Sequence, residues 1–224
     1  MSAPAVPLLR RTARVALRST VLAVSAGATG LVVGVALHSV AGNRMAPWIL
    51  GRAAGVCAYL LLVALVLLGL ALSHPARARL RRPSTATRIR THVTLAMFTL
   101  GATALHIVVL ATDRWAGVGW AGALLPLGAS YRPLPVTLGV IALWLGLLAG
   151  ASATLAGRLP RRAWWPVHKI AAGSLVLVWT HGVLAGSDTP ALLVMYVTTG
   201  MLVLGVAASR YAARTPRELM ELPR

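Results

Sequence analysis

The fold is decided by stretches such as residues 90–112, which read RTHVTLAMFTLGATALHIVVLAT. After the leading arginine, no side chain in this stretch carries a formal charge. A helix rises 1.5 Å per residue, so a helix of this length can cross the roughly 30 Å hydrocarbon core of a bilayer. Two histidines, His92 and His106, lie within it. The stretch therefore predicts a transmembrane helix that carries polar groups at membrane depth.

Six stretches of this kind are present. The other five cover residues 21–41, 47–73, 134–156, 164–185 and 191–209. The connections are short, except for a loop at 113–133 whose Trp115 and Trp120 suit the headgroup zone. The expected fold class is all-α, a polytopic six-helix transmembrane bundle. It divides into a basic N-terminus (1–20), the six-helix domain (21–209) and a short tail (210–224).

The composition agrees with a membrane protein and excludes an ordinary water-soluble domain. Of the 224 residues, 58% are hydrophobic and only 12% are charged. Nucleic-acid binding is not expected, because it needs basic patches interleaved with aromatic side chains, and aromatic residues make up only 5% of the chain. A single cysteine, Cys57, excludes an intrachain disulfide.

The basic residues predict the topology. Lys and Arg number 22 against four Asp and Glu, a formal net charge of +18. With Arg90 at the very start of the third span included, the side that holds the N-terminus carries seventeen arginines, and the opposite side carries only Arg44, Arg114 and Arg132. Because cytoplasmic loops are rich in Lys and Arg, both termini are expected in the cytoplasm. The expected location is a bacterial inner (plasma) membrane.

Four of the six histidines form two pairs, within the third and fifth spans. Thirteen residues separate His92 from His106, and twelve separate His168 from His181. Ionisable residues at membrane depth are costly and usually functional. Both spans run outward in this topology, so we expect an inner pair of His92 with His168 and an outer pair of His106 with His181. The two levels lie about 20 Å apart along the helix axes.

Neutral imidazole is a good axial ligand of haem iron, and helix bundles build such sites from facing side chains. Two stacked haems, each held by one histidine on either side, account for the pattern. With both axial positions filled the iron cannot bind a substrate, so the expected role is electron transfer and no catalytic residue is predicted.

Other roles for these histidines are less well supported. A zinc site held by histidine alone needs three or four ligands within a few ångströms, which pairs about 20 Å apart do not supply. A proton relay usually recruits Asp or Glu, and no span contains either. Helix packing explains one or two such histidines better than four. The relay and the packing role stay open as alternatives.

The two histidine spacings place the rings at different angles around an ideal helix. At 100° per residue, fourteen steps bring the third-span pair to within about 40° of one face, whereas thirteen steps leave the fifth-span pair about 140° apart. If both histidines of the fifth span face the bundle, that span cannot be an ideal helix. We therefore expect an irregularity between Pro166 and Trp179, with Pro166 or Gly173 as its cause.

These features resemble the ferric-reductase-like transmembrane domain, the six-helix haem-binding unit shared by ferric reductases, NADPH oxidases and the membrane subunit of a periplasmic methionine-sulfoxide reductase system. The resemblance covers nearly the whole apolar region. It rests on the two histidine pairs, on GRAAG at 51–55 and on WWPVHKIAAGSLVLVWTHGVLAGSD at 164–188. It implies two haem b groups, with His92 and His168 as iron ligands of the inner haem and His106 and His181 of the outer haem.

The resemblance also gives Arg52 a candidate role. It lies about one turn inside the outer face, where its guanidinium can pair with a haem propionate. Snorkelling to the outer headgroups is an equal alternative. For Arg88 and Arg90, near the inner haem level, the positive-inside bias is the better explanation. His38 and His74, at helix ends, are expected to be interfacial residues rather than ligands.

Three further expectations concern packing. Trp144 and Trp179 fall deep in their spans and are expected to be bulky packing residues. Asp188 flanks a helix end and is expected to be solvated. Gly146 and Gly150 are spaced by four, which permits close approach of a neighbouring helix.

The expected function is that of a dihaem b-type transmembrane electron-transfer protein, an oxidoreductase or its haem-binding membrane subunit. Only fifteen residues follow the last span, and no glycine-rich dinucleotide fingerprint is present. The donor is therefore expected to be a separate flavoprotein reductase or a quinol, and the acceptor to be extracytoplasmic. Flavin or quinone as a further cofactor stays open. The alternative is a non-redox membrane carrier or scaffold whose histidines serve helix packing or proton relay.

Overall fold

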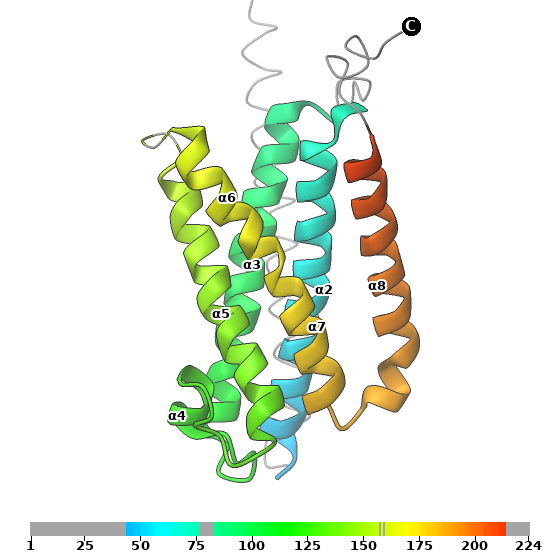
Figure 1. Ribbon diagram of the computed structural model, residues 1–224. Helices are drawn as coiled ribbons and strands as arrows, with labels where there is room; N and C mark the ends of the chain where they lie inside the picture. The colour runs from blue at the N-terminus through cyan, green and yellow to red at the C-terminus, as the bar shows by residue number, and fades with distance from the viewer. Residues whose placement is uncertain (1–43, 77–82, 157, 159, 214–224) are drawn as a thin grey trace, which may run out of the picture. The chain divides into compact units, whose positions relative to one another are not determined.

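The computed structural model describes residues 44–76, 83–156, 158 and 160–213 (Figure 1). The chain divides into two compact units, Met1–Ala46 and Pro47–Arg224, and the second unit holds almost all of the described residues. All regular secondary structure in this part of the chain is helical. The helices are α2 (Ala46–Ser73), α3 (Thr85–Thr112), α4 (Gly119–Leu124), α5 (Pro133–Thr154), α6 (Arg161–Ala172), α7 (Ser174–Ala185) and α8 (Thr189–Ala212).

Five helical segments are long and apolar enough to cross a membrane. They are α2, α3, α5, α8 and the combined segment Arg162–Ala185, and each has at least 22 residues where roughly 20 suffice. The all-α class and the five predicted spans from residue 47 onward are confirmed as helices, and they indicate a multi-pass membrane protein. The first predicted span, 21–41, and His38 within it lie outside the described residues, so the sixth helix stays a prediction.

Helix boundaries follow from local sequence. Ser84 caps α3, because its hydroxyl accepts a hydrogen bond from the backbone N–H of Thr87 at 3.2 Å. A proline lies in the first turn of both α5 and α8, where the missing N–H costs no intrahelical bond. Arg132, just before α5, has a φ of +40° and turns the chain into that helix.

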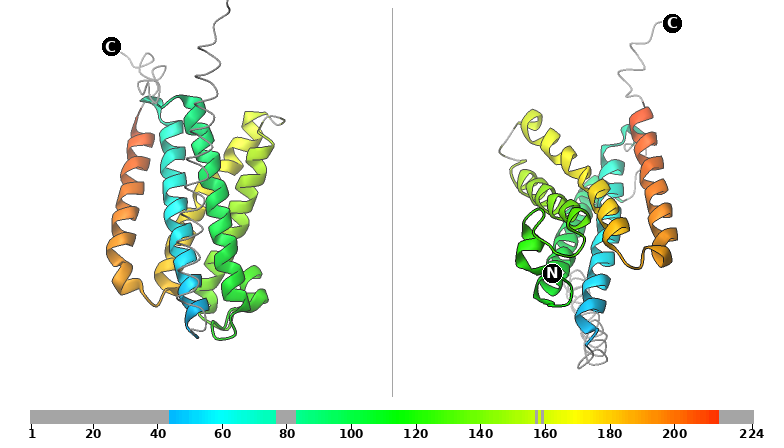
Figure 2. Two further views of the ribbon diagram at one scale, coloured as in Figure 1. Left: turned by 180° about the vertical axis from the view of Figure 1, so that it is seen from behind. Right: turned by 60° about the horizontal axis from the view of Figure 1, so that its bottom comes forward.

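Within Pro47–Arg224 the long helices lie side by side (Figures 1 and 2). α2 lies between α3 and α8, and α5 packs along both α6 and α7. Many large apolar side chains, such as Met97, Phe98, Val194 and Leu204, are exposed on the outside of this unit. An apolar exterior of this kind matches a lipid environment.

An aromatic and hydroxyl cluster joins α2, α7 and α8. The rings of Tyr59 and Tyr196 lie 5.2 Å apart, and both side chains are buried. The Tyr59 and Thr199 hydroxyls are hydrogen-bonded at 2.5 Å, and the indole N–H of Trp179 donates to the carbonyl of Tyr196 at 3.0 Å. Trp179 is therefore a packing residue, as predicted, and it also holds α7 against α8.

The fifth span is broken, as its histidine spacing predicted. α6 ends at Ala172 and α7 begins at Ser174. At the junction the N–H of Gly173 bonds to Ile170 at 2.9 Å, and the N–H of Val176 bonds to Gly173 at 3.1 Å. Both are tighter i to i−3 bonds. The irregularity is therefore at Gly173, whereas Pro166 lies inside α6 without ending it.

Two expectations about the loop and its neighbours were wrong. The predicted loop at 113–133 contains the short helix α4, which lies close to both α3 and α5. Trp144 of α5 is half exposed, and its indole N–H donates to the carbonyl of Leu124 at the end of α4, 3.1 Å away. Trp144 therefore anchors this connection rather than filling a deep core.

Among the described residues, the glycines at positions 146 and 150 do not mark a close helix contact. A Cβ at either position would meet no atom of this part of the chain within 4 Å. The spacing of four is compatible with close approach but does not require it, and none of the described helices uses it.

The Tyr59 hydroxyl can be tested by the substitution Tyr59→Phe, which keeps the ring packing and removes the bond to Thr199. Side-chain hydrogen bonds between membrane helices contribute about 0.6 kcal/mol on average, so the free energy of unfolding should fall by about that amount. SDS titration of the purified protein measures it. Tyr211→Phe, an exposed tyrosine on α8, is the control. Equal stability of the two variants would contradict the role given to this bond.

Candidate functional site

The four intramembrane histidines come together in the two predicted pairs. The rings of His92 on α3 and His168 on α6 have their centroids 6.2 Å apart, at an interplanar angle of 60°. His106 on α3 and His181 on α7 line one cavity of about 510 Å³. The two histidines of α3 are fourteen residues apart, which separates the two levels by about 21 Å.

We call this cavity the outer cavity, because it holds the histidine pair that the sequence predicts on the outer side. It is walled by α2, α3, α5, α7 and α8. Its volume falls within the range of about 300–1,000 Å³ typical of cofactor and small-molecule sites. Most of the lining is apolar, with polar groups contributed by Arg52, Tyr59 and Tyr196 besides the histidines. The Tyr196 hydroxyl lies beside Gly182, where a Cβ would come within 2.7 Å of it.

Backbone hydrogen bonds orient both outer histidines. Nδ1 of His106 lies 2.6 Å from the carbonyl oxygen of Gly51, and Nδ1 of His181 lies 2.8 Å from that of Pro135. A carbonyl oxygen can only accept, so each Nδ1 must carry the proton. The lone pair of each neutral ring is therefore on Nε2, the nitrogen used for a metal.

The inner histidines lack this anchoring. Nδ1 of His92 and Nδ1 of His168 are buried and have no hydrogen-bond partner among the residues that the structure describes. The backbone of Leu65 interacts electrostatically with His92 but falls short of hydrogen-bond geometry. Aromatic rings pack around His168 instead, with Trp164 in an edge contact at 5.8 Å and Trp165 roughly parallel at 6.2 Å.

Arg52 lies at the rim of the outer cavity and is already paired. It forms an ion pair with Asp188, donates to the Ser187 hydroxyl at 2.6 Å, and stacks on the Trp48 ring at 4.5 Å. Asp188 was expected to be merely solvated, which is wrong because its carboxylate holds this guanidinium. No local sequence pattern indicates this pair, since its members are 136 positions apart.

The remaining predicted residues lie away from the outer cavity. His74 accepts from the N–H of Ala76 at 3.0 Å and is hydrogen-bonded to the Ser209 hydroxyl at 3.2 Å, so it joins the ends of α2 and α8, as an interfacial residue would. Arg90 is exposed. Arg88 is only 7% exposed and lies one turn before His92, which topology alone does not explain.

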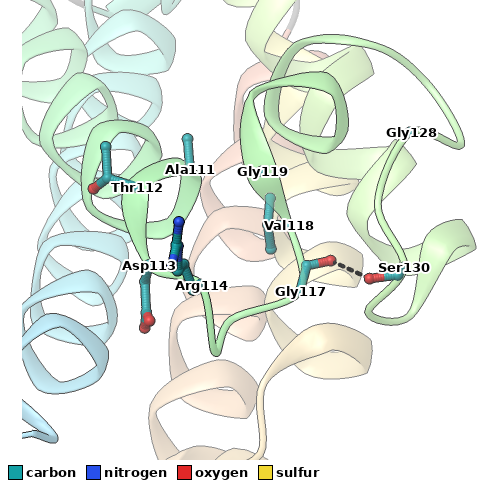
Figure 3. Close-up of a pocket in the computed structure, with 9 residues that line it drawn as sticks. All are labelled: Ala111, Thr112, Asp113, Arg114, Gly117, Val118, Gly119, Gly128 and Ser130. Atoms are coloured by element: carbon teal, nitrogen blue, oxygen red, sulfur yellow. Dashed lines mark hydrogen bonds between the residues drawn. The ribbon is translucent and has the colours of Figure 1, made fainter.

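A second pocket of about 350 Å³ lies along the loop after α3 (Figure 3). It is lined by Asp113, Arg114 and several glycines, and the Ser130 hydroxyl donates to the carbonyl of Gly117 at 2.8 Å. Asp113 is engaged with the N–H of Trp115 at 2.9 Å. With no histidine and no convergent polar groups, it is a poorer candidate than the outer cavity.

Among the described residues, no three His, Cys, Asp or Glu side chains come together as a metal cluster. The arrangement instead offers one imidazole from each side at two levels, which suits a planar metal complex held through its two axial positions. No family model, curated protein or solved structure matches the chain.

The pair at the cavity rim can be tested with Arg52→Gln, Asp188→Asn and the double variant. The two side chains are 22% and 43% exposed, so solvent screens their attraction, and a coupling energy of about 0.5 kcal/mol is expected. Unfolding in SDS measures the cycle. Asp113→Asn combined with Arg52→Gln is the control and should show additive effects. Additivity of the Arg52 and Asp188 changes would contradict the pair.

Proposed function

We propose that the protein is a dihaem b-type transmembrane electron-transfer protein of the ferric-reductase-like kind. The observation that carries this proposal is the arrangement of four imidazoles as two pairs, with α3 on one side and α6 and α7 on the other. Two rings on opposite helices provide the two axial ligands of one haem.

The spacing of the inner pair fits this group. A metal–nitrogen bond of about 2 Å, with about 1 Å more from the nitrogen to the ring centre, places two axial imidazoles with centroids about 6 Å apart. The centroids of His92 and His168 are 6.2 Å apart. The buried nitrogen of each ring is Nδ1, which leaves Nε2 as the more accessible one.

The outer pair fits for a different reason. His106 and His181 each hold a proton on Nδ1 through a backbone carbonyl, so each has an Nε2 lone pair available beside the 510 Å³ cavity. The apolar wall suits a porphyrin face. Arg52 at the rim, with Tyr196 deeper in the cavity, offers donors to the carboxylates of such a group.

The chain's own contribution would be to hold and orient the haem groups and to separate them from water. Bound haem would supply a one-electron redox centre at each level. The histidines fix its position, and the apolar helices exclude water from it. Arg52, already neutralised by Asp188, would orient the propionate edge without adding a full unpaired charge.

The proposal also includes an electron donor and an electron acceptor. A separate flavoprotein reductase or a quinol on the cytoplasmic side would reduce the inner level, and an extracytoplasmic acceptor would take electrons from the outer level. The assignment of the inner level to the cytoplasmic side rests on six transmembrane helices with both termini in the cytoplasm of a bacterium, as the distribution of arginines predicts.

The non-redox alternative is less well supported by the same contacts. A packing role uses the Nδ1 atoms of His106 and His181, which reach neighbouring helices. It gives no role to Nε2 on either ring, or to the cavity between them.

The test is the visible spectrum of the detergent-purified protein. We expect a Soret band with sharp α and β bands on reduction, and two haems per chain by the pyridine haemochrome assay. His106→Ala should reduce the content from two haems to one, while an added donor still reduces the haem that remains. The inner pair does not depend on His106, so it should stay intact.

His74→Ala is the matched control, because His74 lies at the cytoplasmic end of α2 and faces neither pair. It should retain both haems. A colourless protein after expression with ample haem would rule out the proposed function. Retention of both haems by His106→Ala would show that the ligand assignment is wrong.

A further inference from the structure

Three of the four histidines, His92, His106 and His181, lie in close contact with a glycine on a neighbouring helix. A Cβ on Gly55 of α2 would lie 2.9 Å from both Cε1 and Nδ1 of His106. On Gly139 of α5 it would lie 2.9 Å from Nδ1 of His181. Real Cβ atoms do not approach other atoms so closely, so no larger residue fits at either glycine while the ring stays where it is.

Each of these two glycines lies four residues after the carbonyl that the ring binds. Gly51 accepts from His106 and is followed by Gly55, and Pro135 accepts from His181 and is followed by Gly139. In an α-helix the carbonyl of residue i points toward residue i+4. A ring that donates to this carbonyl must therefore lie over position i+4, and only glycine leaves that space open.

The inner level has a looser version of this arrangement. Gly69 lies fourteen residues after Gly55, and His92 lies fourteen residues before His106 on the antiparallel α3. A Cβ on Gly69 would lie 3.3 Å from Cε1 of His92, which is tight but tolerable. The corresponding carbonyl belongs to Leu65, and Nδ1 of His92 does not reach hydrogen-bond geometry with it.

We infer that Gly55 and Gly139 are positioning residues of the outer cofactor site. They let the His106 and His181 rings reach a backbone carbonyl, which fixes the Nδ1–H tautomer, the ring plane and the direction of Nε2. A proton donated from Nδ1 to a carbonyl also makes Nε2 a stronger donor to iron. This inference rests on the proposed haem binding and adds what sets the strength and orientation of the outer axial ligands.

The substitutions Gly55→Ala and Gly139→Ala test it. Each should force one ring off its carbonyl and lower the outer-site haem affinity about tenfold or more, the usual effect of losing a hydrogen bond behind a metal ligand. In the haem that stays bound, the outer midpoint potential should rise, because the ligand becomes a weaker donor. The ferric EPR signal of that haem should shift, since it depends on the angle between the axial ring planes. Gly69→Ala should change the inner haem less.

Two other glycines, Gly101 on α3 and Gly150 on α5, serve as controls. Neither has an atom of the described part of the chain within 4 Å of an added Cβ, and neither lines the cavity. Alanine at these positions should leave haem content, potential and EPR signal unchanged. In a helix interior alanine is intrinsically more favourable than glycine, so a loss seen only at positions 55 and 139 cannot come from helix propensity.

The outcomes separate this inference from the proposed function. If the wild-type protein binds no haem, the proposed function fails. If it binds two haems and Gly55→Ala and Gly139→Ala behave like Gly101→Ala and Gly150→Ala, the positioning role is overturned and haem binding stands. Loss of the outer haem with retention of the inner one supports the inference, because the retained haem reports an intact bundle. Loss of both haems in both variants also overturns it, because general failure of the bundle is not a positioning effect.

Discussion

An imidazole inside a bilayer has two ring nitrogens that each need a hydrogen-bond partner or a metal, and a bilayer offers few hydrogen-bonding groups. Water is absent, and every helical N–H and most helical carbonyls are already used within their own helix. A helical carbonyl still has a second lone pair, and His106 and His181 use it on the neighbouring helices α2 and α5. This bond occupies Nδ1 and leaves Nε2 as the free nitrogen of a ring that lines the outer cavity.

Different helices carry the histidines and the groups that contact them. α3 and the α6–α7 segment bring the histidines, whereas α2 and α5 offer carbonyls and glycine surfaces to receive them. α8 adds no histidine, but through Tyr196 and Thr199 it contacts α2 and α7 and closes the side of the cavity. The pair of Arg52 and Asp188 joins α2 to the turn before α8 at the rim. Among these helices, α3, α6 and α7 therefore supply the imidazoles, α2 and α5 contact them, and α8 closes the cavity.

Much of this architecture could be predicted from the sequence, because membrane helices follow from length and hydropathy. The five spans from residue 47 onward, the two histidine pairings and the break near Gly173 came from counting residues along ideal helices. What could not be predicted depends on contacts between distant segments. The Arg52 and Asp188 pair, the bond from Trp144 to Leu124 and the helix α4 have no local signature. The histidine roles remain predictions, since pairing of rings does not identify what lies between them.

The glycines show how such a signal can be misread. Gly146 and Gly150 have the spacing expected of a helix contact and make none with the described helices, whereas Gly55 and Gly69 are spaced by fourteen and each lies against a histidine ring. The interval from Gly55 to Gly69 on α2 equals the interval from His92 to His106 on α3, fourteen residues in each case. This equality, rather than a motif within one helix, corresponds to the observed contacts. An interval shared by adjacent antiparallel helices indicates repeated contacts at two heights.

The junction at Gly173 gives the two histidine-bearing segments different mechanical characters. α3 is a single continuous rod, so turning it about its axis swings both of its imidazoles through the same angle. α6 and α7 are two shorter rods joined by one tight turn, and each can adopt its own azimuth. The two imidazoles of this segment are therefore not tied to one azimuth, whereas those of α3 are.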